Sequence, residues 1–364
     1  MKIAFYAPLK SPDHPVPSGD RLMARLLMQA MRLGGHEVEV VSELRSFQRE
    51  PEGSGNNLKA AAEAEEQKIA ANWHRDGKPD IWLCYHPYYK ARDLLGPVLC
   101  QRFDVAYVTA ESSYSPKRNA MGWAQTQTAL LADLSFAATN ICFTTRDFDG
   151  LSKADQGLRL AMLPPFIDAA TFAKQAPSPT RYRLATVAMM RPGDKMSSYA
   201  ALAEALKLLP SDLPWTLDII GDGPERKKAQ DLFGAIDAHR IVWHGEKTPE
   251  AIADILSHAS IYVWPGHGEA YGLAYLEAQA AGLPVIAERI AGVPEVVKDG
   301  QTGILTQPGN VTAYADAIIK LMRDNELRHQ MALKARHFAC VERAIEQAAI
   351  ILNSIIENLP GQPS

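Results

Sequence analysis

The stretch IYVWPGHGEAYGLAYLEAQAAGLPVIA, residues 261–287, contains the order of elements that decides the fold. Residues 261–264 form a short apolar run of the kind found in buried parallel strands. A glycine-bearing loop follows, a helical pattern begins near Gly272 and Leu273, and a second apolar run covers residues 284–287. Strand, helix and strand in this order predict a parallel sheet with helices packed on it.

The same alternation of apolar runs and helical patterns occurs in both halves of the chain. In the first half it predicts strands at residues 2–7, 36–42, 81–85, 105–109 and 140–145. In the second half it predicts strands at residues 184–190, 216–220, 241–243, 261–264 and 284–287. Four prolines within residues 164–179 predict a linker, residues 58–75 an exposed helix, and residues 311–359 a helical tail. The pattern therefore predicts two α/β domains followed by helices.

Length and composition are those of an ordinary globular protein. The chain has 364 residues, more than one hydrophobic core supports, with 47% hydrophobic and 22% charged residues. Its 38 Lys and Arg against 42 Asp and Glu offer no basic face for nucleic acid. Four scattered cysteines, no signal peptide and no run near the ~20 apolar residues of a membrane span predict a reduced, cytoplasmic protein.

Two carboxylates flank the helix that begins near Gly272. Glu269 lies in the loop before the helix, and Glu277 lies about one turn inside it. A helix N-terminus offers free backbone N–H groups and the positive end of the helix dipole, which favour a phosphate. Glu277 is then placed to reach a neighbouring ribose diol, and Glu269 to receive hydroxyls of an attached sugar. The alternative is that Glu269 is a helix-terminal charge and Glu277 a solvated residue.

This stretch resembles the donor-binding segment of the family 4 glycosyltransferases, the retaining enzymes of the GT-B fold. The resemblance rests on the spacing of Glu269 and Glu277 with Tyr271-Gly272-Leu273 between them. Further matches are AGLPV at 281–285, GVPE at 292–295, DGQTG at 299–303, GDGP at 221–224, and PFID at 165–168 with Phe172. The likeness covers nearly the whole second half and is looser in the first half, where acceptors vary.

The resemblance implies a fold of two doubly wound, Rossmann-like domains that face each other across a cleft, with a helical C-terminal tail. Residues 1–170 would form the acceptor domain and residues 180–340 the nucleotide-sugar donor domain. Residues 341–364 would form a C-terminal helix that packs back on the N-terminal domain. The implied activity is transfer of a hexose-type sugar from a nucleoside diphosphate sugar to a glycan, lipid or small metabolite, with retained anomeric configuration and without metal or cofactor.

The resemblance also assigns residues to the donor side. It implies catalytic roles for Glu269, Arg191 and Lys195. It implies donor binding by Gly19, Ala270, Tyr271, Gly272, Leu273 and Glu277. Arg191 and Lys195 stand four apart, one closer than the commoner spacing, and as cations they would stabilise charge that develops on the diphosphate. Gly19 is one glycine of the family's usual pair, and its alternative is an ordinary helix start capped by Ser18.

Acceptor-side residues are expected at the ends of first-half strands. His86 ends one strand, and Glu111 stands after the next, where many relatives have a histidine. For both, a structural role is the alternative. Basic side chains also follow one face of the first helix, which favours either a solvated face or peripheral contact with anionic lipid at the inner membrane face. These side chains belong to Arg21, Arg25 and Arg32, with Gln29 among them.

Two motifs and two functions compete with this interpretation. Asp147-Phe148-Asp149 spells the Asp-x-Asp of metal-dependent glycosyltransferases, but here it opens a helix, so we expect no metal. Gly221-x-Gly223 lacks the third glycine of a dinucleotide fingerprint. The chain is alternatively a nucleotide-sugar binding protein without catalysis, or a nucleotide-sugar epimerase, which would need an acid/base pair around the sugar.

Overall fold

The computed structural model describes residues 1–16, 18–51 and 55–360 and divides into two units. The first unit consists of Met1–Pro164 with the chain from Ile345 onward. The second unit is Pro165–Ala344. The chain therefore enters the second unit at the start of the proline-rich stretch and leaves it before its last helix.

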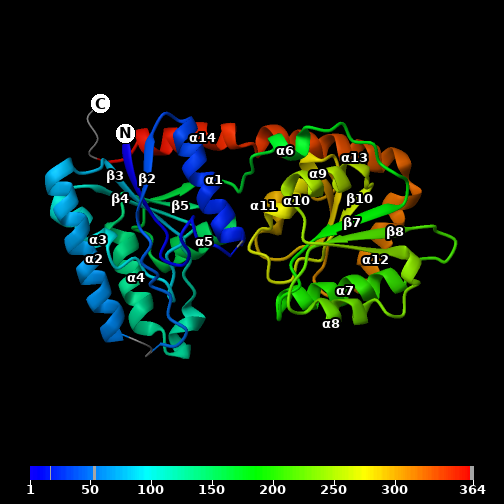
Figure 1. The fold of residues 1–364 in the computed structure, drawn as a ribbon, viewed down its shortest axis with the longest axis horizontal. Helices are drawn as coiled ribbons and strands as arrows, with labels where there is room; N and C mark the ends of the chain where they lie inside the picture. The colour runs from blue at the N-terminus through cyan, green and yellow to red at the C-terminus, as the bar shows by residue number, and fades with distance from the viewer. Residues whose placement is uncertain (17, 52–54, 361–364) are drawn as a thin grey trace. The chain divides into compact units, whose positions relative to one another are not determined.

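In the described part of the first unit, six parallel strands form one sheet flanked by helices, in the order β2-β1-β3-β4-β5-β6 (Figure 1). The strands are β1 Lys2–Tyr6, β2 Glu37–Ser42, β3 Ile81–Tyr85, β4 Ala106–Ala110, β5 Thr139–Cys142 and β6 Leu160–Met162. The helices are α1 Gly19–Leu33, α2 Gly55–Asp76, α3 Gly96–Phe103, α4 Ala124–Phe136, α5 Thr145–Ala154 and α14 Ile345–Glu357, with a 3-10 turn at Pro116–Met121. Helix α14 lies against α1, where Asn353 Nδ2 donates to the Gly34 carbonyl at 3.2 Å.

The second unit, which is described throughout, contains a second parallel sheet in the order β12-β11-β10-β7-β8-β9. Its strands are β7 Arg183–Val187, β8 Thr216–Ile220, β9 Ile241–Gly245, β10 Ile261–Val263, β11 Val285–Glu288 and β12 Gly303–Thr306. Its helices are α6 Ala170–Ala173, α7 Asp194–Lys207, α8 Arg226–Leu232, α9 Pro249–His258, α10 Leu273–Ala280, α11 Val293–Val296, α12 Val311–Arg323 and α13 Asn325–His337. A 3-10 turn covers Ala238–Arg240 and a π-helical segment Phe338–Glu342.

The expected α/β architecture is confirmed, with three differences in detail. Each of the ten predicted strands overlaps an observed strand, but the outermost strands β6 and β12 were missed because edge strands this short give little periodic signal. The predicted linker contains helix α6. The helix expected at residues 58–75 is confirmed as α2 and is largely exposed, but one of its faces buries Ile69, Ala70 and Trp73 in the core of the first unit.

Each sheet has a point where the strand order changes direction. In the first unit β1 lies between β2 and β3, and in the second unit β7 lies between β10 and β8. Crossover connections leave such neighbouring strands in opposite directions, so the loops at the carboxyl ends of the strands separate there and leave room for a ligand. The segments after β1 and β3, and after β7 and β10, are therefore the places to look for functional side chains.

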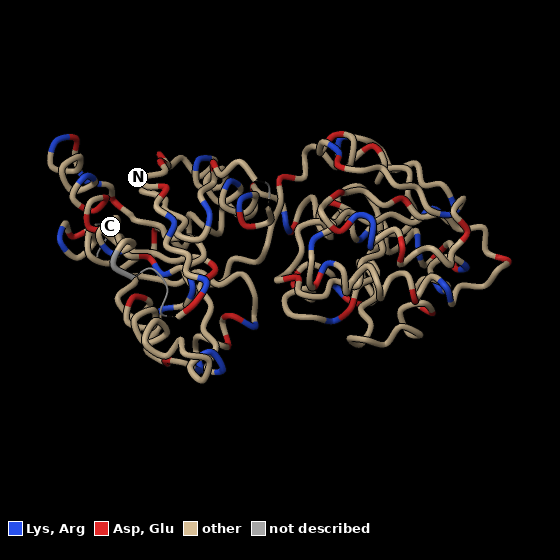
Figure 2. The backbone as a smooth tube through the Cα atoms, turned by 60° about the horizontal axis from the view of Figure 1, so that its bottom comes forward, with Lys and Arg blue, Asp and Glu red and all other residues tan. Residues whose placement is uncertain are grey.

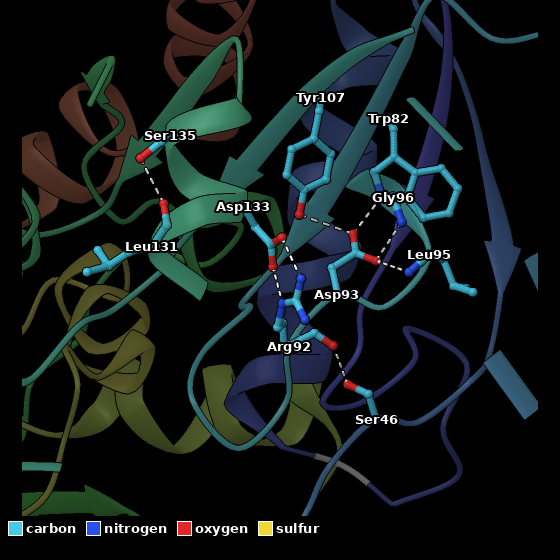
Figure 3. Close-up of polar contacts among 10 residues, drawn as sticks. All are labelled: Ser46, Trp82, Arg92, Asp93, Leu95, Gly96, Tyr107, Leu131, Asp133 and Ser135. Atoms are coloured by element: carbon cyan, nitrogen blue, oxygen red, sulfur yellow. Dashed lines mark hydrogen bonds and ion pairs between the residues drawn. The ribbon is translucent and has the colours of Figure 1, made fainter. Parts of the chain in front are cut away.

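A buried carboxylate, Asp93, anchors the segment that connects β3 to α3 (Figure 3). Its Oδ1 accepts the backbone N–H groups of Leu95 at 2.9 Å and Gly96 at 2.8 Å. Its Oδ2 accepts Trp82 Nε1 at 2.9 Å and the Tyr107 hydroxyl at 3.2 Å. Burial raises the pKa of the Asp93 carboxyl, although these donors oppose the shift.

The residue before Asp93 fixes the same segment from its other side. The Arg92 guanidinium pairs with both carboxylate oxygens of Asp133 on α4, and Ser46 Oγ donates to the Arg92 carbonyl at 2.6 Å (Figure 3). A side-chain pair of this geometry is strong because both guanidinium N–H groups point at one carboxylate. The connection after β3 is thus held in one conformation by neighbours on three other elements.

Charged residues of both signs are spread along the chain. Figure 2 shows Lys and Arg interspersed with Asp and Glu along both units. Among the described residues, no helix combines the length and apolar character needed to span a membrane.

The crowding around Gly96 leads to a stability prediction. A Cβ at this position would fall well inside contact distance of Asp93 Oδ2 and Trp82 Nε1, both buried. We expect Gly96→Ala to lower the free energy of unfolding by about 1–3 kcal/mol, as overpacked cores do. Urea unfolding followed by tryptophan fluorescence measures this.

The matched control is Gly150→Ala in α5, where a Cβ would meet only the Tyr114 carbonyl at 3.9 Å. Alanine is the better helix former by about 0.5–1 kcal/mol, so this variant should be at least as stable as wild type. Equal stability of Gly96→Ala and Gly150→Ala would contradict the role assigned to the Asp93 anchor.

Candidate active site

Glycines shape the loop after β10, which runs toward α10. Gly268 has φ 69° and Gly272 has φ 82°, a region that L side chains rarely adopt. A Cβ at Gly268 would collide with the carboxyl group of Asp194 on α7, and one at Gly272 would stand 2.7 Å from the Tyr275 ring. The loop can therefore lie directly against α7 and α10, with Glu269 held between the two glycines.

The carboxylate of Glu269 is held by two donors from different strand ends. Lys195 Nζ, in the first turn of α7, forms an ion pair with Glu269 Oε1. Trp264 Nε1 donates to the same oxygen at 3.1 Å, and Lys195 Nζ lies 5.7 Å from the centre of the Trp264 ring. The structure thus brings together two predicted catalytic residues, one after β7 and one after β10.

The segment that carries Arg191 is fixed by the Gly221-Asp222-Gly223 loop after β8. Met190 N–H donates to the Asp222 carbonyl at 2.9 Å, and Glu225 N–H donates to the Met190 carbonyl at 3.0 Å. Gly223, at φ 156°, has no room for a Cβ, which would collide with that carbonyl. Arg191 follows directly and is exposed, so the two predicted cations both lie between the end of β7 and the first turn of α7.

Helix α10 begins at Leu273 with Gly272 as its N-cap, as the sequence predicted. No side chain of the described residues caps this end, so its first N–H groups are available to a ligand. The other predicted donor-binding positions differ in exposure: Ala270 is exposed, while Tyr271 and Leu273 are buried. Contacts of the latter two with a ligand would therefore be made through their backbone.

Glu277 lies one turn inside α10 and is half-buried. Among the residues that the structure describes, no side chain donates a hydrogen bond to its carboxylate. Desolvation on burial raises the pKa of Glu277 to about 7. Part of the Glu277 side chain is thus removed from solvent, which a fully solvated residue would not be.

Sequence analysis missed a second pair beside Glu269. His267 Nε2 lies 3.0 Å from Glu288 Oε2, and Glu288 Oε1 accepts the backbone N–H of Gly309 at 3.0 Å. Glu288 ends β11 and is buried. The signal in the sequence was a charged residue at the carboxyl end of the otherwise apolar run Val-Ile-Ala-Glu.

In the first unit, the two predicted acceptor-side residues follow neighbouring strands, and His86 lies at the point where the strand order changes. His86 follows β3 and its Nδ1 lies 3.2 Å from Asp20 Oδ1 in the first turn of α1. Glu111 follows β4 and accepts the Tyr85 hydroxyl at 2.6 Å. Both His86 and Glu111 have φ 58°, a strained conformation for residues with a Cβ.

Charges around His86 shift its titration. Burial alone would lower the pKa of the imidazole, but the charges of Glu111 and Asp20 outweigh it, and the pKa is raised. Burial raises the pKa of the Glu111 carboxyl, against the opposing effects of His86 and the Tyr85 hydroxyl. The cluster therefore favours a protonated imidazole beside a carboxyl group.

The start of α1 matches both interpretations of Gly19. Ser18 is the N-cap and its Oγ accepts the Arg21 N–H at 3.3 Å, as in an ordinary helix start. A Cβ at Gly19 would meet nothing within 4 Å, so the backbone there is also open to approach.

The arginines of α1 are engaged with the protein itself. Arg25 Nε donates to the Pro12 carbonyl at 2.7 Å, and Arg32 donates to the Val38 carbonyl at 2.8 Å. The guanidinium groups therefore hold the loop after β1 and the strand β2 against the helix.

Asp147 has a capping role at α5. Thr144 Oγ1 accepts the Asp147 N–H at 3.0 Å and donates to Asp147 Oδ2 at 2.7 Å. Within the described residues, no group of three or more His, Cys, Asp or Glu side chains is arranged to hold a metal ion.

Comparison with known proteins matches the second unit to a family. Residues 177–338 match the family model of glycosyl transferases group 1. The chain is 31% identical to N-acetyl-alpha-D-glucosaminyl L-malate synthase of Bacillus anthracis over 39% of this chain and 37% of that protein. It is 27% identical to alpha-D-kanosaminyltransferase of Streptomyces kanamyceticus over 80% of this chain and 78% of that protein.

Solved structures share the fold across both units. HepE of Anabaena in complex with UDP superposes with a TM-score of 0.73 at 15% identity, covering 99% of this chain and all of that one. The matches to the first curated relatives are partial: the chain spans 37% of the N-acetyl-alpha-D-glucosaminyl L-malate synthase and 23% of a D-inositol 3-phosphate glycosyltransferase of Corynebacterium diphtheriae. The second unit therefore contains a domain of the group 1 glycosyl transferases, and the chain has the GT-B fold of these solved structures.

The raised pKa of Glu277 leads to a prediction for stability against pH. The folded state favours the protonated carboxyl up to about pH 7, whereas the unfolded chain releases the proton near pH 4.5, so the contribution of Glu277 to wild-type stability falls as pH rises between these values. Glu277→Gln cannot ionise. The free energy of unfolding of Glu277→Gln minus that of wild type should therefore increase by about 1–2 kcal/mol between pH 5 and pH 8, as measured by urea unfolding. The change is smaller than for a fully buried carboxyl because solvent reaches part of Glu277.

The exposed Glu246 provides the control for this comparison. Glu246→Gln should show no such dependence on pH, because its carboxylate is solvated in both states. A Glu277→Gln variant whose advantage is constant from pH 5 to pH 8 would mean that Glu277 titrates normally.

The raised pKa of His86 leads to a prediction for its titration. Glu111 is the strongest of the charges that raise the pKa of its imidazole, so Glu111→Gln should lower that pKa, as measured by NMR titration of the ring. Asp13→Asn, which removes a carboxylate paired with Arg25 in the same unit, should leave the titration unchanged. If the His86 titration is unaltered in Glu111→Gln, the charge of Glu111 does not raise the pKa of the imidazole.

Proposed function

We propose that the chain transfers a hexose-type sugar from a nucleoside diphosphate sugar to a hydroxyl-bearing acceptor, with retained anomeric configuration. The observation that carries the proposal is the Lys195–Glu269 pair beside the uncapped start of α10, where the strand order of the second unit changes. An ammonium group, a helix N-terminus and a carboxylate together match a ligand with an anionic bridge and a hydroxyl-rich end. The complex of HepE with UDP-glucose supports the same class of ligand.

The donor-side roles follow from charge. Arg191, Lys195 and the start of α10 neutralise the diphosphate, with no metal ion required. Glu277 accepts hydrogen bonds from the ribose hydroxyls, which supply the donors that its half-buried carboxylate lacks. Glu269 accepts hydroxyls of the transferred sugar. Ala270, Tyr271, Gly272 and Leu273 contribute backbone. Gly19, where a Cβ would meet nothing within 4 Å, remains a predicted donor-binding residue.

In the transfer step the bond between the anomeric carbon and the phosphate oxygen breaks, and a bond from the same carbon to the acceptor oxygen forms on the same face. The acceptor proton passes to the departing phosphate oxygen. Negative charge therefore grows on the diphosphate, and fixed cations stabilise it more in the transition state than in the bound donor. Lys195 is well suited to this role because its ammonium group is already fixed by Glu269.

The acceptor side belongs to the first unit in this proposal. His86 and Glu111 contact the acceptor, which is a glycan, a lipid or a small metabolite, and their strained backbone at two strand ends supports a functional role. Peripheral contact with a membrane through α1 has less support, because Arg25 and Arg32 donate to backbone carbonyls of the protein. We place the protein in the cytoplasm.

The donor is identified first, by thermal shift with UDP, ADP, GDP and their sugar conjugates, since a ligand of the folded state raises its stability. With that donor, Glu269→Gln should nearly abolish transfer, and Lys195→Met should lower kcat by about 10²–10³, the usual effect of losing one charge-stabilising group. Release of the nucleoside diphosphate is the measurement. Glu246→Gln, an exposed glutamate of the same unit, should keep wild-type turnover.

Three results would contradict the proposal. Normal turnover by Glu269→Gln removes the assigned site. Donor binding by wild type without hydrolysis or transfer identifies a binding protein. Conversion of the donor to an isomer in the absence of acceptor identifies an epimerase.

A further inference from the structure

A histidine lies in the same loop as Glu269. His267 lies in the loop after β10, two residues before Glu269, and about a quarter of its side chain is exposed (26%), whereas its partner Glu288 is buried (2%). The partly exposed ring of His267 can therefore be reached by a ligand that binds beside Glu269.

The orientation of His267 is fixed by three elements. Its backbone N–H donates to Ser198 Oγ on α7 at 2.9 Å. Its ring Nε2 lies 3.0 Å from Glu288 Oε2 at the end of β11, and Glu288 Oε1 is occupied by the Gly309 N–H from the segment before α12. An ionised carboxylate can only accept hydrogen bonds, so the ring nitrogen that faces Glu288, Nε2, carries the proton. In the neutral ring the other nitrogen, Nδ1, is then a hydrogen-bond acceptor.

We propose that His267 recognises the sugar of the donor: its Nδ1 accepts a hydrogen bond from one hydroxyl of the transferred hexose, and Glu288 is the positioning residue that sets the tautomer of the ring. This inference rests on the proposed function and deepens it. A site that hydrogen-bonds a substrate hydroxyl rejects analogues without that hydroxyl, so His267 contributes to the choice of sugar and leaves the binding of the nucleoside diphosphate unaffected.

The second unit contains a matched pair away from this loop. His244 Nε2 lies 2.6 Å from Oδ1 of the buried Asp218, which also binds Arg183. His244 belongs to β9, at the opposite edge of the sheet from β12 and separated from β10 by β7 and β8. A second histidine–carboxylate pair, away from the loop after β10, is thus present in the same unit and serves as a control.

The test compares affinity for a nucleoside diphosphate with affinity for its glucose conjugate. UDP, ADP and GDP and their glucose conjugates are screened on wild type, and the pair that binds is titrated by calorimetry against three variants. In His267→Ala the affinity for the conjugate should fall about tenfold relative to the diphosphate, as expected for one lost hydrogen bond. His244→Ala should keep the wild-type ratio, even if it lowers the melting temperature.

Glu288→Gln tests the positioning role while keeping the shape of the buried side chain. The Gly309 N–H needs the amide oxygen, so the amide nitrogen faces His267 and donates to Nε2, which moves the ring proton to Nδ1. This variant should therefore lose the same preference for the conjugate as His267→Ala, although the diphosphate still binds. It also keeps the test available if His267→Ala does not fold.

Deoxyglucose conjugates identify the hydroxyl. Removal of one hydroxyl should weaken binding to wild type about tenfold but have no effect on binding to His267→Ala.

The outcomes separate this inference from the proposed function. An unchanged ratio of conjugate to diphosphate affinity in both His267→Ala and Glu288→Gln overturns the inference alone, and so does an equal loss of both ligands. A wild type that binds none of the six nucleotides contradicts the proposed function, and the inference is then lost with it.

Discussion

The pairing of β7 with β10 determines where the second unit can hold a ligand. The chain leaves β7 toward β8 and leaves β10 toward β11, on opposite sides of this pair, so the two loops separate at the carboxyl edge. Lys195 follows the first strand and Glu269 the second, and their ion pair joins positions 74 residues apart. The loop after β10 needs its glycines because this approach leaves no space for a Cβ at Gly268 against Asp194 or at Gly272 against Tyr275.

Three glutamates of the second unit show how the fold gives one residue type different properties. Glu269 has a cation and an indole N–H as partners, so its charge is stabilised. Glu288 is buried but accepts at both oxygens. Glu277 is half-buried, no side chain in the described part of the chain donates to it, and desolvation raises its pKa to about 7. A ligand with hydroxyl groups would provide Glu277 with what the protein does not, and this is why an unpaired carboxylate at this position favours a sugar or a ribose.

The first unit repeats the same geometry with other side chains. His86 and Asp20 meet at its own reversal of strand order, and Glu111 follows the neighbouring strand. The connection after His86 cannot relax, because Asp93 and Arg92 hold it through buried hydrogen bonds to Trp82 and Asp133. Such support explains how the positive φ of His86 persists in the folded protein.

The sequence by itself determined the alternation of strands and helices, the central strands of both sheets, and the residue types at the carboxyl ends of β7 and β10, because apolar runs and glycine-bearing loops are local signals. It also placed Glu269 before α10 and Glu277 inside it, because the helical pattern begins between these two residues. Only the tertiary structure decided which distant groups meet, namely that Lys195 pairs with Glu269 and that Glu288 holds His267, and that burial raises the pKa of Glu277. These relations depend on strand order and on burial, and neither is present in the spacing of residues along the chain.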